Sequence, residues 1–139
     1  MTNSYANSEK NYHQVKVFIE LYVRDITYNI TLFSEVLGFS VIRDEGNFAE
    51  LHSGNSMLLL NDGSDLELGH PFRGRLDPIN NGIGTEIGFD VSDVSAVYKK
   101  ASQFNGLKMT EIKLQSWGLK DFRIVTPDNY YLRVTELHK

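Results

Sequence analysis

The chain has 139 residues, of which 41% are hydrophobic and 23% charged, and its formal net charge is −4. This length and apolar content predict a single compact domain. The acidic balance, with Lys and Arg scattered along the chain, argues against a nucleic-acid partner. The sequence contains no cysteine, which excludes disulfides, thiolate nucleophiles and cysteine metal ligands.

The sequence shows no sign of a membrane segment. No apolar run approaches the roughly 20 residues needed to cross a bilayer, and the N-terminus has no hydrophobic signal segment. We therefore expect a cytoplasmic protein without a membrane partner. Residues 1–14 are polar and aperiodic, and we expect them to form a frayed tail before one domain over residues 15–139.

The first half of the chain is predicted to contain a strand, a helix and three further strands. Apolar residues alternate over residues 15–23, which indicates a strand with two occupied faces. Asp25 is a good N-cap for a helix whose apolar stripe ends at Gly38. The three short strands are expected at residues 39–43, 48–52 and 57–61.

The second half repeats this order. Asp93 takes the place of Asp25 as helix cap, and Gly106 takes the place of Gly38 as helix stop. The corresponding strands are expected at residues 86–91, 107–112, 122–126 and 130–135. A unit repeated once indicates two duplicated modules, residues 15–61 and 83–136, because stacked arrays need three or more repeats. The connection between them, residues 62–84, is rich in Gly, Asp, Asn and Pro. It has room to line a site or a dimer contact.

A curled antiparallel sheet with a helix on one face leaves its other face uncovered. The sheet of the second module is the obvious cover, and a cavity would then lie between the two sheets. The predicted fold class is therefore α+β, with two tandem βαβββ modules that form curled antiparallel sheets around a cavity.

The chain combines a duplicated βαβββ unit with a V-x-D helix cap, an L-G-F helix stop and a final P-D-N-x-x-L segment. With these motifs it resembles the vicinal oxygen chelate superfamily of glyoxalases, extradiol dioxygenases, and fosfomycin- and bleomycin-resistance proteins. The stretch S-W-G-L-K-D-F-R-I-V-T-P-D-N at residues 116–129 is particularly similar to the bleomycin-resistance branch. The resemblance implies a homodimer in which the first half of one chain and the second half of another complete each cavity.

The resemblance also implies where a metal would bind. Enzymes of the superfamily hold a divalent ion with His or Gln in the first strand of a half and Glu in the last. These positions fall on Phe18, Leu59, Glu86 and Arg133. Phe and Leu have no lone pair to donate, and a guanidinium does not lose its proton to coordinate. We therefore predict no metal, no cofactor and no catalytic residue.

Two interpretations of Glu86 and Arg133 stay open. The two side chains form an ion pair that fills the old metal position, or Arg133 offers its donors to a carboxylate or phosphate while Glu86 orients it. Both interpretations predict that the two side chains are in contact.

The predicted ligand-binding face combines the resemblance with strand parity. Its members are Phe18, Glu20, Tyr22, Leu59, Glu86, Asp90, Trp117, Tyr131 and Arg133. Parity adds Glu20, Tyr22, Asp90 and Tyr131 to the four inherited positions. The resemblance implies that Trp117 lies at the mouth of the groove, and its alternative role is a packing anchor for the loop. For Glu20 and Asp90 the alternative is a solvated strand face. His70 lies in the connection, from which it could reach the cavity.

Three functions fit these patterns. The first is a metal-free homodimer of the bleomycin-resistance type that binds a small molecule, sequesters a drug or an aromatic or cationic metabolite, and serves antibiotic resistance. The second is a metal-dependent lyase, isomerase or dioxygenase with a displaced metal site, for instance Glu20, Glu86 and Asp90. The third is a structural or regulatory module whose cavity is filled by its own side chains. We favour the first, because only one of the four inherited positions can coordinate a metal.

Overall fold

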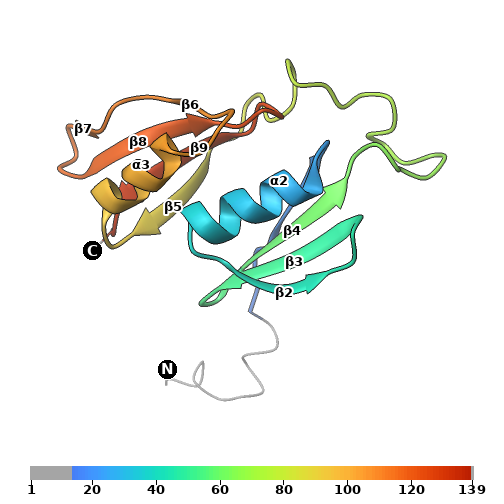
Figure 1. Ribbon diagram of the computed structural model, residues 1–139, viewed down its shortest axis with the longest axis horizontal. Helices are drawn as coiled ribbons and strands as arrows, with labels where there is room; N and C mark the ends of the chain where they lie inside the picture. The colour runs from blue at the N-terminus through green and yellow to red at the C-terminus, as the bar shows by residue number, and fades with distance from the viewer. Residues whose placement is uncertain (1–13, 139) are drawn as a thin grey trace, which may run out of the picture.

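The two modules have the same order of elements in the computed structural model, which describes residues 14–138 (Figure 1). The first contains β1 (Ile19–Val23), α2 (Ile26–Thr31), the π-helical segment η2 (Leu32–Val36), β2 (Ser40–Asp44), β3 (Phe48–Ser53) and β4 (Ser56–Asp62). The second contains β5 (Ile87–Val91), α3 (Val94–Ser102), β6 (Lys108–Met109), β7 (Lys113–Leu114), β8 (Lys120–Val125) and β9 (Tyr131–Glu136). The predicted order is confirmed, and the expected tail lies, except for residue 14, outside the described residues.

Each module forms its own sheet. The strand order is β1-β4-β3-β2 in the first sheet and β5-β9-β8-β6 in the second, where β7 also pairs with β8. The first and last strands of each module pair in parallel, and the other neighbours pair antiparallel. The single strand predicted at residues 107–112 is not found. Two short strands, β6 and β7, take its place, and each pairs with a different part of β8.

The helices begin where the sequence predicts. The Asp25 carboxylate accepts a hydrogen bond from the Tyr28 N–H, and Asp93 accepts one from the Ala96 N–H, both at 3.0 Å. Each bond satisfies a backbone donor that the first helical turn leaves without a partner. Within residues 14–138, no helix has the length and apolar character needed to cross a membrane.

Alternation along the strands directs every second side chain toward the helices. The core positions predicted from parity are buried, at 8% exposure or less: Leu21, Val23, Leu58, Leu60, Ile87, Leu132 and Val134. Phe89, the eighth, is partly buried against the same cluster. Burying side chains of this size stabilises the fold by about 1.5–3 kcal/mol each.

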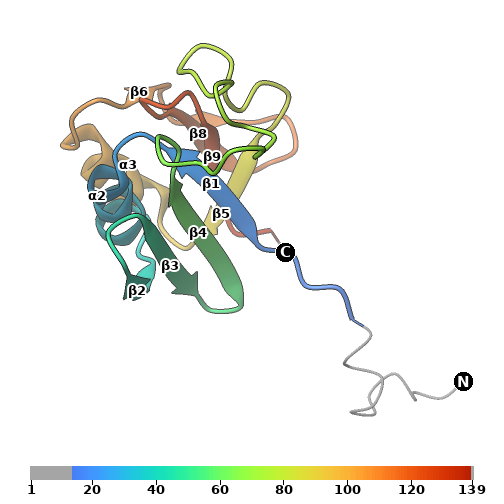
Figure 2. The ribbon, with the colours of Figure 1, turned by 90° about the vertical axis from the view of Figure 1, so that its right-hand side faces the viewer.

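The two modules meet through their helical sides. Phe89 of β5 packs against Phe33 and Phe39 of the first module, with ring centroids 6.1 Å apart in both pairs. Figure 2 shows the two sheets diverging from β1 and β5, with α2 and α3 on the side between them. The helix-free faces of the sheets therefore point away from each other. The expectation that the second sheet covers the first does not hold within one chain.

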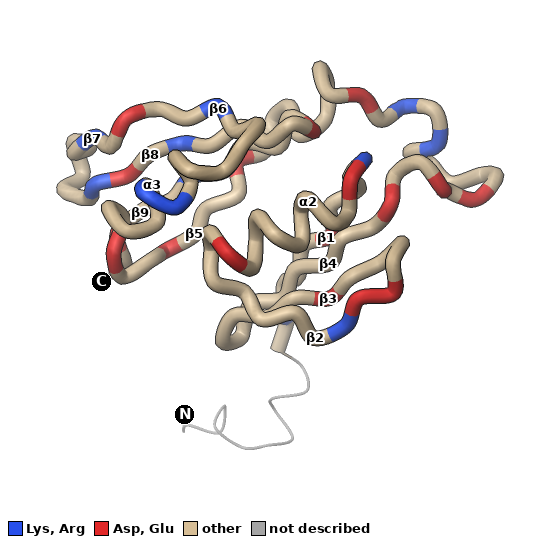
Figure 3. Tube along the Cα trace, viewed as in Figure 1, with Lys and Arg blue, Asp and Glu red and all other residues tan. Residues whose placement is uncertain are grey.

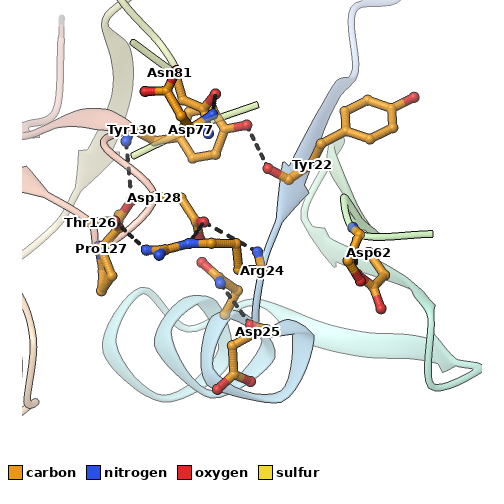
Figure 4. A network of polar contacts seen from close by, with 12 residues as sticks. Tyr22, Arg24, Asp25, Asp62, Asp77, Asn81, Thr126, Pro127, Asp128 and Tyr130 are labelled. Carbon is orange, nitrogen blue, oxygen red and sulfur yellow. Dashed lines mark hydrogen bonds and ion pairs between the residues drawn. The ribbon is translucent and has the colours of Figure 1, made fainter. Parts of the chain in front are cut away.

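A polar network fixes this junction (Figure 4). Arg24 donates from its backbone N and its Nε to Asp128 Oδ1, at 3.2 and 2.9 Å, and Asp128 is only 2% exposed. The Tyr130 hydroxyl donates to the Tyr22 carbonyl at 2.7 Å. Burial raises the pKa of Tyr130, so this hydroxyl stays a donor at neutral pH. The network joins the end of β1 to the P-D-N segment of the second module.

The connection between the modules is held by Asn129. Its Nδ2 donates to the carbonyls of Ile79 and Asn81, at 3.1 and 2.9 Å. Its backbone φ of 72° is positive, a conformation that asparagine tolerates better than most residues. This residue therefore places the connection beside the turn between β8 and β9.

Candidate functional site

The helix-free face of the second sheet carries a row of charged side chains. Strand pairing places Arg133 of β9 between Gly88 of β5 and Arg123 of β8. Leu132 and Val134, on either side of Arg133 along the strand, are fully buried. Because side chains alternate along a strand, Arg133 points to the open face.

Glu86, which directly precedes β5, joins the two arginines. Its Oε1 accepts from Arg123 Nε at 3.1 Å, and its Oε2 lies 3.6 Å from Arg133 Nε. The predicted contact between Glu86 and Arg133 is confirmed. Arg123 also pairs with the buried Asp121, at 2.7 Å from NH1 to Oδ1. Burial alone lowers the pKa of Arg123, but the charges of Asp121 and Glu86 outweigh it and hold that pKa above its usual value.

The two arginines differ in how well their donors are satisfied. Arg123 has close carboxylate partners on two sides. Arg133 Nε is buried and has no hydrogen-bond partner among residues 14–138. The guanidinium carbon of Arg133 lies 6.0 Å from the ring centroid of Trp117, which is within reach of a cation–π contact. Because the Arg133 side chain is 27% exposed, part of its planar fork is accessible from the open face.

Trp117 and Tyr131 lie at the open side of this cluster. Trp117, in the loop between β7 and β8, is 54% exposed, and Tyr131 at the start of β9 is 38% exposed. An anchor that packs a loop onto the core would be buried more deeply. Both aromatic rings are therefore accessible to another molecule.

The matching row on the first sheet is acidic. Strand pairing places Leu59 of β4 between Glu20 of β1 and Glu50 of β3. Glu20 accepts a hydrogen bond from the Asn61 side chain at 2.6 Å, and Glu50 contacts His52 Nε2 at 2.7 Å. Figure 3 shows the acidic position on β3 and the positions of both signs on β8. Both glutamates therefore have partners on their own sheet.

Aromatic residues of the connection cover one end of the first sheet's open face. The Tyr22 ring lies 5.3 Å from the His70 ring and 5.1 Å from the Phe72 ring, centroid to centroid. Burial raises the pKa of Tyr22, and the charge of Glu20 adds to the effect. His70 thus reaches the predicted face. Phe72 lies there too, although the sequence did not single it out.

Phe18 and Asp90 lie apart from the charged cluster. They line a groove of about 490 Å³ between the start of β1, the β3–β4 turn and β5. Phe18 is 50% exposed there, and Asp90 pairs with His138 at 2.8 Å. Of the predicted ligand-binding residues, the groove contains only these two.

The residues at the four inherited positions do not fit a metal ion. Only Glu86 among them has an oxygen to offer, and that carboxylate already pairs with Arg123. The displaced set of Glu20, Glu86 and Asp90 is not brought together either. Within the described range of the chain, no three His, Cys, Asp or Glu side chains lie close enough to hold one ion. No catalytic step through a metal follows from this arrangement.

Arg123 and Asp121 belong to this cluster but were not predicted from the sequence. Both alternate along β8 with Phe122 and Ile124, which are buried. Applying strand parity to β8, as to the other strands, would have placed both residues on the open face. Gln115 Nε2 donates a hydrogen bond to Asp121 Oδ1 at 2.8 Å. No sequence pattern predicts this bond, because Gln115 lies in a loop.

Comparison with known proteins identifies the fold. The family model described as the glyoxalase/bleomycin resistance protein/dioxygenase superfamily matches residues 15–134. No functionally curated protein matches the sequence.

Solved structures share the architecture at low sequence identity. A protein of unknown function from Agrobacterium tumefaciens C58 has a TM-score of 0.73 and 22% identity, over 90% of this chain and 95% of its own. A glyoxalase/bleomycin resistance protein/dioxygenase family enzyme from Burkholderia phytofirmans PsJN has a TM-score of 0.72 and 19% identity, over 89% and 100%. A bleomycin-binding protein solved with bleomycin has a TM-score of 0.62 and 21% identity, over 90% and 100%. At this identity, the likeness shows the fold alone.

Proposed function

Since the chain belongs to the glyoxalase/bleomycin resistance protein/dioxygenase superfamily, we propose that it is a metal-free, homodimeric binder of a small organic molecule, of the bleomycin-resistance type. The observation that carries this proposal is the ion pair of Glu86 with Arg123 and Arg133. It stands where the resemblance implies a metal, and the exposed ring of Trp117 lies beside it. A polar centre next to an aromatic wall is typical of small-molecule sites.

The open faces of the two sheets support a two-fold dimer. Among residues 14–138, no helix and no part of the other sheet covers either face, and apolar or aromatic side chains are exposed on both, Phe18 on the first and Tyr131 on the second. A second copy would bring its acidic first sheet over the arginine row of this second sheet. Opposite charges favour that pairing over one of like faces. Because a two-fold interface is reciprocal, the dimer would contain two equivalent sites.

The ligand class we propose is an aromatic drug or metabolite. Trp117 and Tyr131 offer flat, accessible rings, and Glu20 and Glu50 of the partner's first sheet would supply negative charge for a cationic part of the ligand. A binder of this kind acts by sequestering its ligand, which in the cytoplasm would serve antibiotic resistance. The bleomycin-binding protein that shares the fold makes bleomycin the first compound to test.

Sedimentation equilibrium at micromolar concentration tests the dimer. We expect a single dimeric species. The charge complementarity of the faces predicts weaker association at high salt, because screening reduces attraction between exposed charges. A monomer at micromolar concentration would contradict the proposal.

A thermal-shift screen with bleomycin and a panel of aromatic cations tests binding. A ligand at 100 times its dissociation constant should stabilise the protein by about 2.7 kcal/mol. Trp117→Ala should reduce the shift, whereas Leu68→Ala, at an exposed site in the connection, should leave it unchanged. Metal analysis separates the enzyme alternative: a stoichiometric transition metal that disappears in Glu86→Gln would rule out metal-free binding.

A further inference from the structure

We infer that the ligand carries an oxyanion, a carboxylate or a phosphate, and that this group binds the guanidinium of Arg133. The inference deepens the proposed function and rests on it. It begins from an asymmetry between Arg123 and Arg133, which lie side by side on paired strands of one sheet.

The carboxylates of the cluster are used mainly by Arg123. Asp121 lies 2.7 Å from Arg123 NH1, and Glu86 lies 3.1 Å from Arg123 Nε. The second oxygen of Glu86 is 3.6 Å from Arg133 Nε, which is too long for a hydrogen bond. Glu86 therefore orients Arg133 by charge and leaves its donors free.

The free donors of Arg133 suit an oxyanion. A buried donor without a partner is unfavourable, and Arg133 Nε is such a donor among residues 14–138. A guanidinium presents its N–H groups in a planar fork that matches the two oxygens of a carboxylate or phosphate. An entering oxyanion would accept hydrogen bonds from these donors. It would also neutralise the positive charge of Arg133, which Glu86 at 3.6 Å neutralises only in part.

Trp117 gives this site an aromatic side. Its ring lies 6.0 Å from the Arg133 guanidinium carbon and is 54% exposed. A ring in that position limits the orientations of the guanidinium and offers a surface for a flat group. The geometry thus favours a ligand in which an aromatic ring carries the oxyanion.

The carboxylates of the first sheet act on a ligand through their negative charge, because neither of them lacks a partner as Arg133 does. Glu20 and Glu50 have partners on their own sheet. The rings of Tyr22, His70 and Phe72 have centroids 5.1–5.3 Å apart, so they contact one another and leave no space between them for a cation. On the two faces, the buried side-chain atoms without a hydrogen-bond partner among residues 14–138 are Asp121 Oδ2 and Arg133 Nε. Asp121 already has a close cation through its other oxygen, 2.7 Å from Arg123. Arg133 has no carboxylate that close, so its natural partner is an added anion.

Fluorescence of the full chain tests the inference, because Trp117 is its only tryptophan. We use four probes of similar size: benzoate, phenyl phosphate, benzylammonium and benzyl alcohol. Benzoate and phenyl phosphate should change the emission saturably, with dissociation constants at least tenfold below those of the other two. The tighter of the two anions shows whether the site prefers a carboxylate or a phosphate.

Two arginine variants connect the signal to the site. Arg133→Gln should raise the dissociation constant of the anions at least tenfold. Arg43→Gln is the matched control, because Arg43 also lies near a carboxylate, 3.5 Å from Glu50, and over an aromatic ring, 5.0 Å from the Phe48 centroid. It should leave anion binding unchanged. Sedimentation at micromolar concentration should still show a dimer for both variants, because Arg123 keeps the arginine row positively charged in Arg133→Gln.

Each of the following results would overturn the inference. Arg133→Gln binds the anions as tightly as the unmodified protein, or benzylammonium binds as tightly as benzoate. In the third, no anion binds and Arg133→Gln weakens the dimer, because a carboxylate of the second copy then occupies the guanidinium. If the cation or the alcohol binds while the anions do not, the inference fails and the proposed function stands. If none of the four probes and no compound of the bleomycin panel binds, both fail.

Discussion

The two modules place opposite charges at the same point of the same framework. In the first sheet, the row across β1, β4 and β3 is Glu20, Leu59, Glu50. In the second sheet, the equivalent row is Gly88, Arg133, Arg123. The three strands that carry each row have the same order and pairing directions in both sheets, so the difference within the rows lies in the side chains.

This difference shows how a duplicated framework acquires a site. Two identical acidic faces would repel each other in a two-fold dimer, whereas an acidic face and a basic face attract. The partners of the charges differ as well. Glu50 pairs with exposed side chains, but Arg123 pairs with Asp121, which is 1% exposed. The basic row is therefore built into the fold, and the acidic row lies on its surface.

Of the changes that test this difference, replacing Arg123 with Leu should lower the free energy of unfolding the most. The change leaves Asp121 buried with only Gln115 as partner, and an uncompensated buried charge is strongly destabilising. We expect a loss of about 3 kcal/mol in the free energy of unfolding, measured by urea denaturation. Glu50→Gln is the control, with an expected loss below about 1 kcal/mol, because its ion pairs are exposed. Equal losses would show that the two rows are alike.

A second difference between the modules lies in the turn before each last strand. The first module has Gly54 there, and the second has Asp128, whose carboxylate accepts two hydrogen bonds from Arg24. Asp128→Ala should therefore lower the free energy of unfolding by about 2 kcal/mol. Asn55→Ala in the first turn should change it by less than about 0.5 kcal/mol, because Asn55 is exposed. Urea denaturation compares the two, and a large effect of Asn55→Ala would remove the distinction.

The turn before β9 differs from the turn before β4 also in Asn129. Replacement of Asn129 should affect stability in two ways that can be separated. Asn129→Ala loses two bonds to the connection and strains the backbone at a φ of 72°. We expect a loss of about 1.5 kcal/mol in thermal or urea unfolding. Asn129→Gly relieves the strain but not the lost bonds, so it should recover part of the loss. Full recovery with Gly would mean that the bonds to the connection contribute nothing.

The sequence could predict the features that local chemistry determines. Asp25 and Asp93 cap their helices, because an acidic side chain at that place satisfies free backbone donors. The buried positions followed from strand parity, which depends only on the alternation of side chains. The expected contact of Glu86 with Arg133 needed the resemblance to the superfamily in addition, because the resemblance assigns both residues to the inherited metal position.

The sequence could not predict contacts between distant segments. Arg24 and Asp128 are far apart along the chain, and nothing in either local pattern indicates that they meet. The aromatic contact of Phe72 with Tyr22 depends on the path of the connection, and loop paths follow from tertiary packing. The arrangement of the sheets around the helices likewise depended on Phe89 packing into the first module.

The smallest expected effect concerns the acid at the end of β4. Hydrogen bonds from the hydroxyl and the backbone N–H of Ser64 hold the pKa of Asp62 below its usual value of 3.8. A carboxyl whose pKa is lower in the folded state stabilises the fold above that usual value, and the contribution is lost as the pH falls through the folded pKa. Because Asp62 is largely solvated, Asp62→Asn should cost less than about 0.5 kcal/mol at pH 7.

The difference in unfolding free energy between Asp62→Asn and the unmodified protein should therefore shrink between pH 5 and pH 2, roughly the range in which a paired Asp loses its contribution. Ser64→Ala is the matched test, because it keeps the carboxylate and removes the hydroxyl bond. It should show a smaller loss with the same direction of pH dependence. A difference that stays constant over this range would mean that the Ser64 bonds do not favour the charged form, and that Asp62 serves only to end the strand.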